Sequence, residues 1–395
     1  MRKRVAVTGF GIVCALGNDK KSVKEALMNN LNKMQELSKI KDYGVLNHVK
    51  VGRTDVDEPN ISSPNDFDKS EIMARMALEE ACLEAGYENL SFEQFGIRAS
   101  LSLATSVMGS EYIIKYSGEK SNDAEWLIKS KAYASRMAKE FKIYGGVYTT
   151  SSACASGSAG LGIAFDLIKS GQNDVVLCGG TDHISDISVF GFKSLNTLSE
   201  DRCKPFDKLR DGINIGEGSA FFVFEEYEHA IKRNAKILGE IIGYGLANDA
   251  YHITSPDPNG EGAYHSMKMA LDDIEDENLS EIYVNAHGTG TKANDEMELK
   301  AIKKAFGDIQ IYMSSTKALT GHCLGAAGSI EFAFSLMFLE EGKIPKTANS
   351  NFDIATVENI RDEIPADFSA KRILSNSFAF GGNDATIIVE KYTKD

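Results

Sequence analysis

The chain has 395 residues, of which 43% are hydrophobic, so it is long and apolar enough for a large α/β body and a disordered chain is excluded. Acidic residues outnumber basic ones by 57 to 43, and the net charge of −14 argues against nucleic acid or an anionic membrane as the main partner. The six cysteines are dispersed, with no CxxC pair and no His/Cys cluster at metal-ligand spacing. This pattern predicts no disulfide framework, no metal site and a reducing, cytoplasmic location.

The first predicted element is a buried strand over residues 5–7 that leaves through the glycine turn TGFG. Basic residues ahead of this apolar run imitate a signal peptide, but Thr8, Gly9 and Gly11 interrupt the run too early. The turn also fails as a dinucleotide fingerprint, because Cys14 stands where the third glycine of GxGxxG would fall.

Along the rest of the chain, short runs of strand-forming residues alternate with segments in which apolar residues recur at the spacing of a helix. In chain order the predicted elements are helix 68–86, strand 97–103, helix 125–141, strand 146–150, helix 155–170, strand 174–178, strand 220–224, strand 237–245, helix 262–273, strand 282–285, helix 295–306, strand 311–314, helix 326–341, strand 373–377 and strand 385–389. This alternation predicts an α/β protein with a largely parallel sheet covered on both faces.

A charged segment over residues 225–236 separates two predicted strands and suggests a division into two halves, residues 1–235 and residues 236–395. The longest uncharged stretch, residues 143–165, is crowded with Gly, Ser and Thr and lacks the apolar density of a membrane span. No membrane partner is therefore predicted.

Cys154 lies in SSACASG, where a predicted strand runs through small residues into an apolar helix. Unsatisfied backbone N–H groups and the positive end of the helix dipole at such a junction favour a thiolate. The small neighbours leave room for a substrate carbonyl to approach. The alternative is a buried structural cysteine at a crowded contact between helix and sheet.

Two histidines lie in comparable settings. His287 follows a strand in NAHGTGT, and His322 lies in TKALTGHCLGAAG, where a strand again passes through small residues into a helix. Ligands bind at the carboxyl ends of the strands in open α/β sheets, so we expect Cys154, His287 and His322 to meet at one edge.

Lys317 and Glu331 add a charge pair to the same region. Glu331 lies in a helix that is apolar on nearly every face, where an unpaired carboxylate is costly, and Lys317 is the nearest cation in sequence. Lys317 and Glu331 form either a purely structural salt bridge or a pair that sets the charge state and position of the histidines. Near the C-terminus, NSFAFGG places Phe378 and Phe380 beside Gly381 and Gly382, either as a mobile aromatic hinge or as an ordinary hairpin.

Taken in this order, SSACASG, NAHGTGT, SSTKALTGHCLGAAGSIE and NSFAFGG resemble the β-ketoacyl-[acyl-carrier-protein] synthases, the elongating Cys-His-His condensing enzymes of the thiolase fold. The resemblance covers essentially the whole chain. It implies two duplicated halves in a five-layered α-β-α-β-α arrangement. It also implies an acyltransferase that condenses an acyl group with malonyl-[acyl-carrier-protein], losing CO2, to give a 3-oxoacyl-[acyl-carrier-protein] in fatty-acid, polyene or polyketide assembly.

The resemblance also implies roles for single residues. Cys154 would take the acyl group, and His287 and His322 would hold the malonyl thioester carbonyl and stabilise the enolate. The backbone N–H groups of Cys154 and Phe380 would form the oxyanion hole. Lys317 and Glu331 would orient the site, and Thr289 and Thr291 would form hydrogen bonds to the pantetheine arm. Phe380 would act as a gate, and Phe378 would contact the substrate. Met108 would shape the acyl pocket, or it is an ordinary core methionine.

The partners implied are an acyl carrier protein, which delivers the substrate on its phosphopantetheine arm, and a second subunit. That subunit makes either a homodimer or a heterodimer with a related chain-length factor. No tightly bound cofactor is expected.

Two departures from the family pattern stand out. The gate segment reads AFGGND rather than GFGGTN, which changes Ala379, Asn383 and Asp384. The stretch that corresponds to the usual basic docking helix is acidic, so docking of an acidic carrier must use other residues: Lys129, Lys131, Arg136 and Lys139, or Arg202, Lys204, Lys208 and Arg210. Both departures are compatible with a dedicated pathway.

Two other functions are weighed against this one. A thiolase-like enzyme that uses coenzyme A esters usually differs in its second active-site residue, whereas this chain has both histidines. A non-catalytic partner subunit generally lacks the nucleophile, which this chain retains at Cys154.

Overall fold

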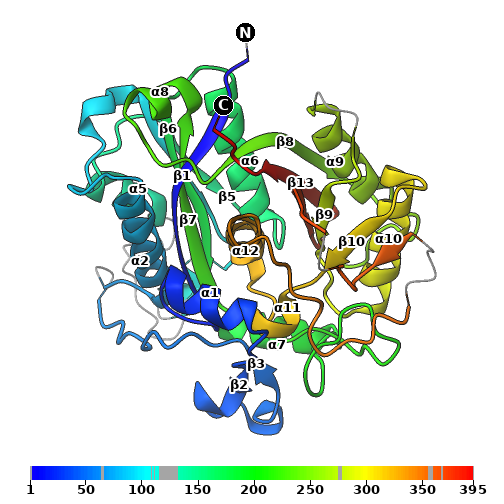
Figure 1. The fold of residues 1–395 in the computed structure, drawn as a ribbon. Helices are drawn as coiled ribbons and strands as arrows, with labels where there is room; N and C mark the ends of the chain where they lie inside the picture. The colour runs from blue at the N-terminus through cyan, green and yellow to red at the C-terminus, as the bar shows by residue number, and fades with distance from the viewer. Residues whose placement is uncertain are drawn as a thin grey trace.

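The computed structural model of the chain describes residues 2–63, 66–107, 109–110, 112–114, 132–274, 278–354, 359–365 and 368–394. Eleven strands form one sheet in the order β11-β10-β9-β12-β13-β8-β1-β7-β6-β4-β5 (Figure 1). Their bounds are β1 Val5–Cys14, β4 Ala99–Ala104, β5 Val147–Thr150, β6 Val175–Asp182, β7 Gly218–Glu226, β8 Gly239–Asn248, β9 Ile282–Asn285, β10 Ile311–Ser314, β11 Ile360–Arg361, β12 Arg372–Phe378 and β13 Asn383–Glu390.

The helices and a small second sheet complete the described elements. The α-helices are α1 Lys20–Met28, α2 Lys69–Glu84, α5 Tyr133–Glu140, α6 Ser156–Lys169, α7 Asp186–Ser194, α8 Tyr227–Lys232, α9 Glu261–Asp272, α10 Lys292–Phe306, α11 Lys317–Thr320 and α12 Ala327–Glu341. Strands β2 (Gln35–Glu36) and β3 (Lys50–Val51) pair with each other in the small sheet.

The order of the strands repeats within the large sheet. The series β1, β7, β6, β4, β5 contains two antiparallel pairings followed by two parallel ones. The series β8, β13, β12, β9, β10 contains the same pairings in the same order. Such a repeat is what duplicated halves produce, and the boundary between residues 235 and 236 stays a prediction.

The prediction of a largely parallel sheet is wrong at the centre of the sheet, where five consecutive pairings from β12 to β6 are antiparallel. A parallel pairing needs a crossover of a dozen or more residues. Residues 379–382 between β12 and β13 form only a short turn, so these strands pair as a hairpin. The strand periodicity itself is correct, since every predicted strand is present.

Helices separate and cover the two parts of the sheet, which are the series from β1 to β5 and the series from β8 to β11. Helices α2 and α5 pack on one outer side, against β1, β7, β4 and β5, and α9 covers β8 and β13 on the other side, with α10 packed on α9. Helices α6 and α12 contact both parts and each other, so they lie between them (Figure 1). This arrangement confirms the predicted five-layered α-β-α-β-α architecture.

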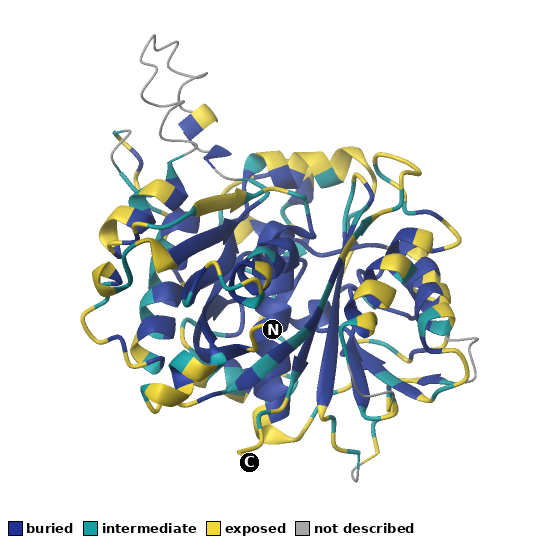
Figure 2. Cartoon of the chain, turned by 90° about the horizontal axis from the view of Figure 1, so that it is seen from above, coloured by how far each residue is buried: buried dark blue, intermediate teal, exposed yellow. Residues whose placement is uncertain are grey.

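The middle layer is buried on all sides. In α12 every residue from Ala327 to Leu339 is buried, whereas the outer helices alternate between buried and exposed faces (Figure 2). Small residues let α6 and α12 approach closely: a Cβ added to Gly157 would stand 2.6 Å from the backbone N of Ser329, and one added to Gly328 would stand 2.8 Å from the backbone N of Ser158.

We therefore expect Gly157→Ala to lower the melting temperature, because the added methyl group forces the two central helices apart. Overpacking of this kind costs about 1–3 kcal/mol. Gly191→Ala in α7 is the matched control, since its Cβ meets nothing within 4 Å and alanine is the better helix former. Thermal unfolding followed by circular dichroism compares the two, and equal melting temperatures would contradict this packing.

The glycine turn predicted after residue 7 is absent. Strand β1 continues through Gly9 and Gly11 to Cys14. Side chains at these two positions would clash with the carbonyl oxygens of Ala81 and Ala77, so the glycines permit close packing of α2 on β1. Of the predicted helix 125–141, the described part is α5, and residues 125–131 lie outside the described residues.

Candidate active site

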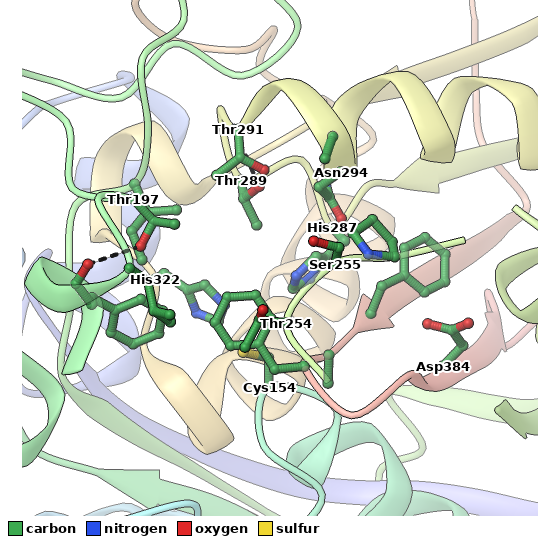
Figure 3. Close-up of a pocket in the computed structure, with 18 residues that line it drawn as sticks. Cys154, Thr197, Thr254, Ser255, His287, Thr289, Thr291, Asn294, His322 and Asp384 are labelled. Atoms are coloured by element: carbon green, nitrogen blue, oxygen red, sulfur yellow. Dashed lines mark hydrogen bonds between the residues drawn. The ribbon is translucent and has the colours of Figure 1, made fainter. Parts of the chain in front are cut away.

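Cys154 lies on the turn after β5, His287 on the loop after β9, and His322 after the short helix α11 that follows β10. All three line a single cavity of about 260 Å³ (Figure 3). Four other predicted site residues, Thr289, Thr291, Phe378 and Phe380, also line this cavity. Lys317 and Glu331 do not line it, and Met108 lies outside the described residues. The further lining residues are Phe192, Leu195, Thr197, Ile213, Thr254, Ser255, Pro256, Ala293, Asn294, Ala379 and Asp384.

Cys154 lies on a tight turn between the end of β5 and the start of α6. Ala153 has a φ of 48°, a left-handed conformation that few residues other than glycine adopt. The Ser156 hydroxyl accepts a hydrogen bond from the Ser152 N–H at 2.8 Å and donates one to the Ala153 carbonyl at 2.6 Å. This turn holds the thiol at the wall of the cavity, with the residue 7% exposed.

Burial controls the charge state of Cys154. It raises the pKa of the thiol to about 12, although the Lys317 ammonium and the backbone N–H groups of Phe380 and Cys154 lower it. The expectation that the helix terminus favours a thiolate is therefore not met, because removal of water outweighs the helix terminus. The resting side chain is a thiol, and the backbone N–H groups of Cys154 and Phe380 are close enough to lower its pKa.

His287 and His322 face each other across the cavity, with ring centroids 5.3 Å apart and ring planes at 82°. The backbone of His322 is fixed by its N–H, which donates to the Asn214 carbonyl at 2.7 Å. The His322 Nδ1 accepts a hydrogen bond from the Leu324 N–H at 3.1 Å. A neutral His322 ring must then carry its proton on Nε2.

Both imidazoles are neutral at physiological pH. Burial lowers the pKa of His287 well below its usual value, and the Lys317 ammonium and His322 lower it further. Burial and the Lys317 ammonium likewise lower the pKa of His322. Each ring therefore offers one N–H donor to a ligand rather than a positive charge.

Lys317 and Glu331 form an ion pair behind the cavity, with both side chains almost fully buried. Burial raises the pKa of Glu331, while the Lys317 ammonium opposes that shift. The Lys317 charge also acts on Cys154 and on both histidines. The pair is thus close enough to influence the charge state of all three groups that line the cavity.

Glu298 of α10 is a supporting residue that the sequence did not reveal. Its carboxylate accepts hydrogen bonds from the backbone N–H groups of His287 and Gly288, each at 2.8 Å, and so fixes the loop that carries His287. It is fully buried, and burial raises its pKa to about 7. In the sequence, its position three residues after Asp295 was the single hint that both acids lie on the same face of a helix. Asp295 is also buried on α10, and it accepts a hydrogen bond from the Gly290 N–H at 3.2 Å.

The segment after β12 carries Phe380 into the cavity and is tied to the loop that follows β8. The Gly381 N–H donates to the Ile253 carbonyl at 2.7 Å, and the Asp249 N–H donates to the Gly382 carbonyl at 2.9 Å. Gly381 and Gly382 have φ values of 83° and 73°, which favour glycine at both positions.

A second, largely apolar cavity of about 340 Å³ meets the first at Cys154. Phe192 and Phe380 line both cavities, with ring centroids 5.9 Å apart. Phe192 is not predicted from the sequence, because an aromatic residue on an amphipathic helix usually belongs to a core. The pair separates two spaces that both reach the thiol.

Asp384, one of the departures from the family pattern, lines the first cavity and is 4% exposed. A Cβ on Gly262 would clash with the carboxyl group of Asp384 and with the Cβ and backbone N of Asp249, so both acids lie beside the start of α9. Burial raises the pKa of Asp384 to about 8, and the negative charges of Asp249, Glu298 and Asp257 raise it as well. Asp384 is therefore mostly protonated at neutral pH.

We expect Asp384→Asn to be more stable than the wild type at high pH. The folded chain holds the Asp384 proton more tightly than an unfolded chain with a pKa near 3.8, so its stabilising contribution is complete at acid pH and is lost as the pH rises to about 8. Asparagine is isosteric and does not titrate. The melting-temperature difference, variant minus wild type, should grow by several degrees between pH 5 and pH 9. A constant difference would contradict the raised pKa of Asp384.

Within the described ranges, no group of three or more His, Cys, Asp or Glu is placed to hold a metal ion. In the same part of the chain, no helix combines the length and the apolar character needed to cross a membrane.

Comparisons with known proteins agree with this geometry. The family models "Beta-ketoacyl synthase, N-terminal domain" and "Beta-ketoacyl synthase, C-terminal domain" match residues 2–230 and 238–351. The chain is 32% identical over 425 residues to the 3-oxoacyl-[acyl-carrier-protein] synthase 2 of Coxiella burnetii, with 99% of both chains covered.

Solved structures extend the comparison. The ishigamide ketosynthase/chain length factor is 29% identical with a TM-score of 0.83, and 100% of both chains is covered. A type II polyketide ketosynthase solved with its acyl-carrier protein is 26% identical with a TM-score of 0.85, covering 99% of this chain and 100% of that one. The predicted thiolase fold is thereby confirmed.

Proposed function

The chain belongs to the β-ketoacyl synthase family, and on that premise we propose that it condenses an acyl group with malonyl-[acyl-carrier-protein] to form a 3-oxoacyl-[acyl-carrier-protein]. The observation that carries this proposal is the meeting of one buried thiol and two neutral imidazoles in a single cavity. The enzyme class is acyltransferase, and the substrates arrive on the phosphopantetheine arm of a carrier protein.

In the first step Cys154 Sγ attacks the thioester carbonyl of the acyl carrier. A new carbon–sulfur bond forms at Cys154, the thioester bond to the arm breaks, and the thiol proton leaves with the arm's sulfur. Since the resting Cys154 is protonated, the proton has to move during the attack rather than before it.

In the second step the two histidines act on the malonyl thioester. His322 offers its Nε2–H, because its Nδ1 is occupied by the Leu324 N–H, and neutral His287 offers a second N–H across the cavity. Both donors stabilise the enolate oxygen that forms when CO2 leaves. The enolate carbon then bonds to the acyl carbonyl carbon, and the bond to Cys154 breaks. The Cys154 sulfur leaves as a thiolate and takes up one proton from water, which restores the resting thiol.

The oxyanion of each acyl-transfer step would lie between the backbone N–H groups of Cys154 and Phe380. Both groups already lower the pKa of the Cys154 thiol. Thr289 and Thr291 line the same cavity, with hydroxyl oxygens 2.9 Å apart, and would hydrogen-bond the arm. Phe380, held between two cavities, would admit the acyl chain to the apolar one and then exclude water.

Product analysis tests the reaction itself. The chain is incubated with an acyl carrier and with malonyl carrier, and the carrier-bound products are measured by mass spectrometry. A carrier bearing the acyl group lengthened by two carbons and one oxo group, with release of one CO2, supports the proposal. Loading and turnover with coenzyme A esters but with no carrier substrate would favour the thiolase-like alternative instead.

A second candidate is the catalytic subunit of a heterodimer with a chain-length factor, which the similarity to the ishigamide ketosynthase/chain length factor favours. Strand β5 is the edge of the large sheet and exposes Val147 and Tyr148, a surface that suits pairing with another subunit. Homodimer and heterodimer both fit this edge. The chain is purified alone and after co-expression with a chain-length factor, and light scattering then distinguishes a homodimer from a heterodimer. The cytoplasmic location stays a prediction.

A further inference from the structure

One polar group in the candidate active site has no part in the proposed reaction, the carboxyl group of Asp384. Asp384 lies near the start of β13, on the side of the cavity that holds the neutral His287 and away from His322 (Figure 3). The strands on either side of β13 place Ala247 and Phe378 opposite it. Asp384 is 4% exposed, and its carboxyl group forms no hydrogen bond or ion pair with the residues that the structure describes. A buried carboxylate without a donor is costly, so this position favours the neutral acid.

The charged groups that face Asp384 within the described ranges are all acidic. They come from the segment between β8 and α9 and from α10: Asp249, Asp257 and Glu298. Helix α9 faces Asp384 with Gly262, and the Glu261 carboxylate next to Gly262 is paired with Lys304 at 2.6 Å. Burial raises the pKa of Asp384 to about 8, and the three acids raise it as well. Asp384 is therefore almost entirely neutral at pH 6.5 and about nine-tenths charged at pH 9.

The segment between β8 and α9 also holds the turn of residues 379–382, which we call the gate turn. The Gly381 N–H donates to the Ile253 carbonyl, and the Asp249 N–H donates to the Gly382 carbonyl. The Asp249 carboxylate itself lies against the gate turn, because a Cβ on Gly382 would stand 2.0 Å from its Oδ1. The position of the gate turn therefore depends on its fit against this carboxylate.

Asp384 follows the gate turn closely in sequence and lies beside the same carboxylate. A Cβ on Gly262 would stand 2.3 Å from the Asp384 Oδ2 and 2.8 Å from the Asp249 Cβ. The Asp249 carboxylate is fixed in place, since it accepts hydrogen bonds from the N–H groups of Tyr251 and Asp257, each at 3.0 Å. A negative charge on Asp384 would repel this carboxylate and so push apart the two segments that hold the gate turn.

We propose that Asp384 is a positioning residue whose protonated carboxyl group allows the gate turn to close over Cys154, and whose ionisation loosens that turn. The proposal rests on the proposed function, because the gate turn carries Phe380, and it adds a dependence on pH to the exclusion of water from the acyl group. The family pattern has asparagine at this position, which does not ionise, so the dependence belongs to this chain's own sequence.

Hydrogen exchange tests the position of the gate turn without any reaction. Wild type and Asp384→Asn are labelled at pH 6.5 and at pH 9, and mass spectrometry follows the peptides that contain Gly381 and Asp249, whose N–H groups bond the two segments together. Comparing the two proteins at one pH cancels the intrinsic pH dependence of exchange. We expect the ratio of exchange rates, wild type over variant, to rise at least about fivefold between pH 6.5 and pH 9, while peptides of α12 stay protected in both proteins.

Hydrolysis of acyl-Cys154 tests closure over the thioester. The protein is loaded and separated from the carrier, and its mass is followed as water breaks the acyl–sulfur bond to give the free acid and the Cys154 thiol. The ratio of hydrolysis rates, wild type over Asp384→Asn, should rise at least about fivefold between pH 6.5 and pH 9. Asp272→Asn is the control, because it makes the same change at an exposed acid on α9 that is paired with Lys268. The ratio of wild type to this control should not change with pH.

The outcomes separate this role of Asp384 from the proposed function. If the wild type loads from no acyl donor but the exchange ratio rises with pH, the condensing activity is refuted and the positioning of the gate turn stands. If the wild type loads and condenses but the exchange ratio is the same at both pH values, the activity stands and the role of Asp384 is refuted. Faster exchange that includes α12 would show unfolding of the whole chain, and a constant hydrolysis ratio would show that the turn does not close over Cys154; either result overturns the proposal.

Discussion

Cys154→Ala is expected to abolish acyl loading and condensation while leaving the fold intact. The thiol is the nucleophile in the proposed mechanism, and alanine removes it without adding volume to the crowded turn between β5 and α6. Removal of a covalent nucleophile typically lowers turnover by about 10³-fold or more. Intact-protein mass spectrometry after incubation with an acyl carrier measures loading, and circular dichroism checks the fold.

Cys323→Ala is the matched control, because Cys323 is a buried cysteine beside His322 that does not line the cavity of Cys154. Among the residues that the structure describes, its thiol donates to backbone carbonyls alone, including that of Glu217 at 3.6 Å. This variant should load acyl groups normally. Condensation that persists in Cys154→Ala, or loading that disappears in Cys323→Ala, would refute the assignment of the nucleophile.

His287→Ala and His322→Ala are expected to load the acyl group but to lose decarboxylation of the malonyl carrier by about 10²–10³-fold each. The reason is that each imidazole supplies one hydrogen bond to the developing enolate, and a missing donor of this type costs about that factor. Release of labelled CO2 from malonyl carrier measures the loss. Loading is followed separately by protein mass.

Glutamine at His322 sharpens this test. The His322 Nδ1 already accepts from the Leu324 N–H, so its ligand-facing donor is at Nε2, where a glutamine amide can place an N–H. His322→Gln should therefore decarboxylate faster than His322→Ala. His265→Ala, at an exposed position on α9, is the control and should behave as wild type. A histidine variant that decarboxylates but cannot load would reverse the division of roles.

Much of the candidate site could be predicted because its residues share a local pattern. Cys154, His287 and His322 each lie after a strand and beside small residues, and this pattern marked all three. A shared edge of parallel strands does not explain why they meet, because five antiparallel pairings make β5 run opposite to β9 and β10. The helices and strands could be predicted as well, because their apolar residues recur at regular spacing over long stretches of the sequence. The antiparallel centre of the sheet was not, since strand order is decided by contacts between segments distant in sequence.

The supporting residues could not be predicted for a related reason. Glu298 occupies a helix whose sequence resembles a solvated surface, and only its bonds to the loop of His287 reveal its position. The protonated states of Cys154 and Asp384 depend on how much water the surrounding layers exclude. Local motifs indicate which groups are present, whereas tertiary packing determines their charge.

The central claim is that Cys154 carries the growing acyl chain between two carrier-bound substrates. The measurement that tests it most directly is a two-stage experiment on the wild-type chain, in which an acyl carrier is added first and malonyl carrier second, with the protein mass recorded after each stage. The account predicts an acyl adduct on the peptide containing Cys154, which disappears in the second stage as the lengthened 3-oxoacyl carrier forms. An adduct on another residue, or condensation without any adduct on Cys154, would contradict it.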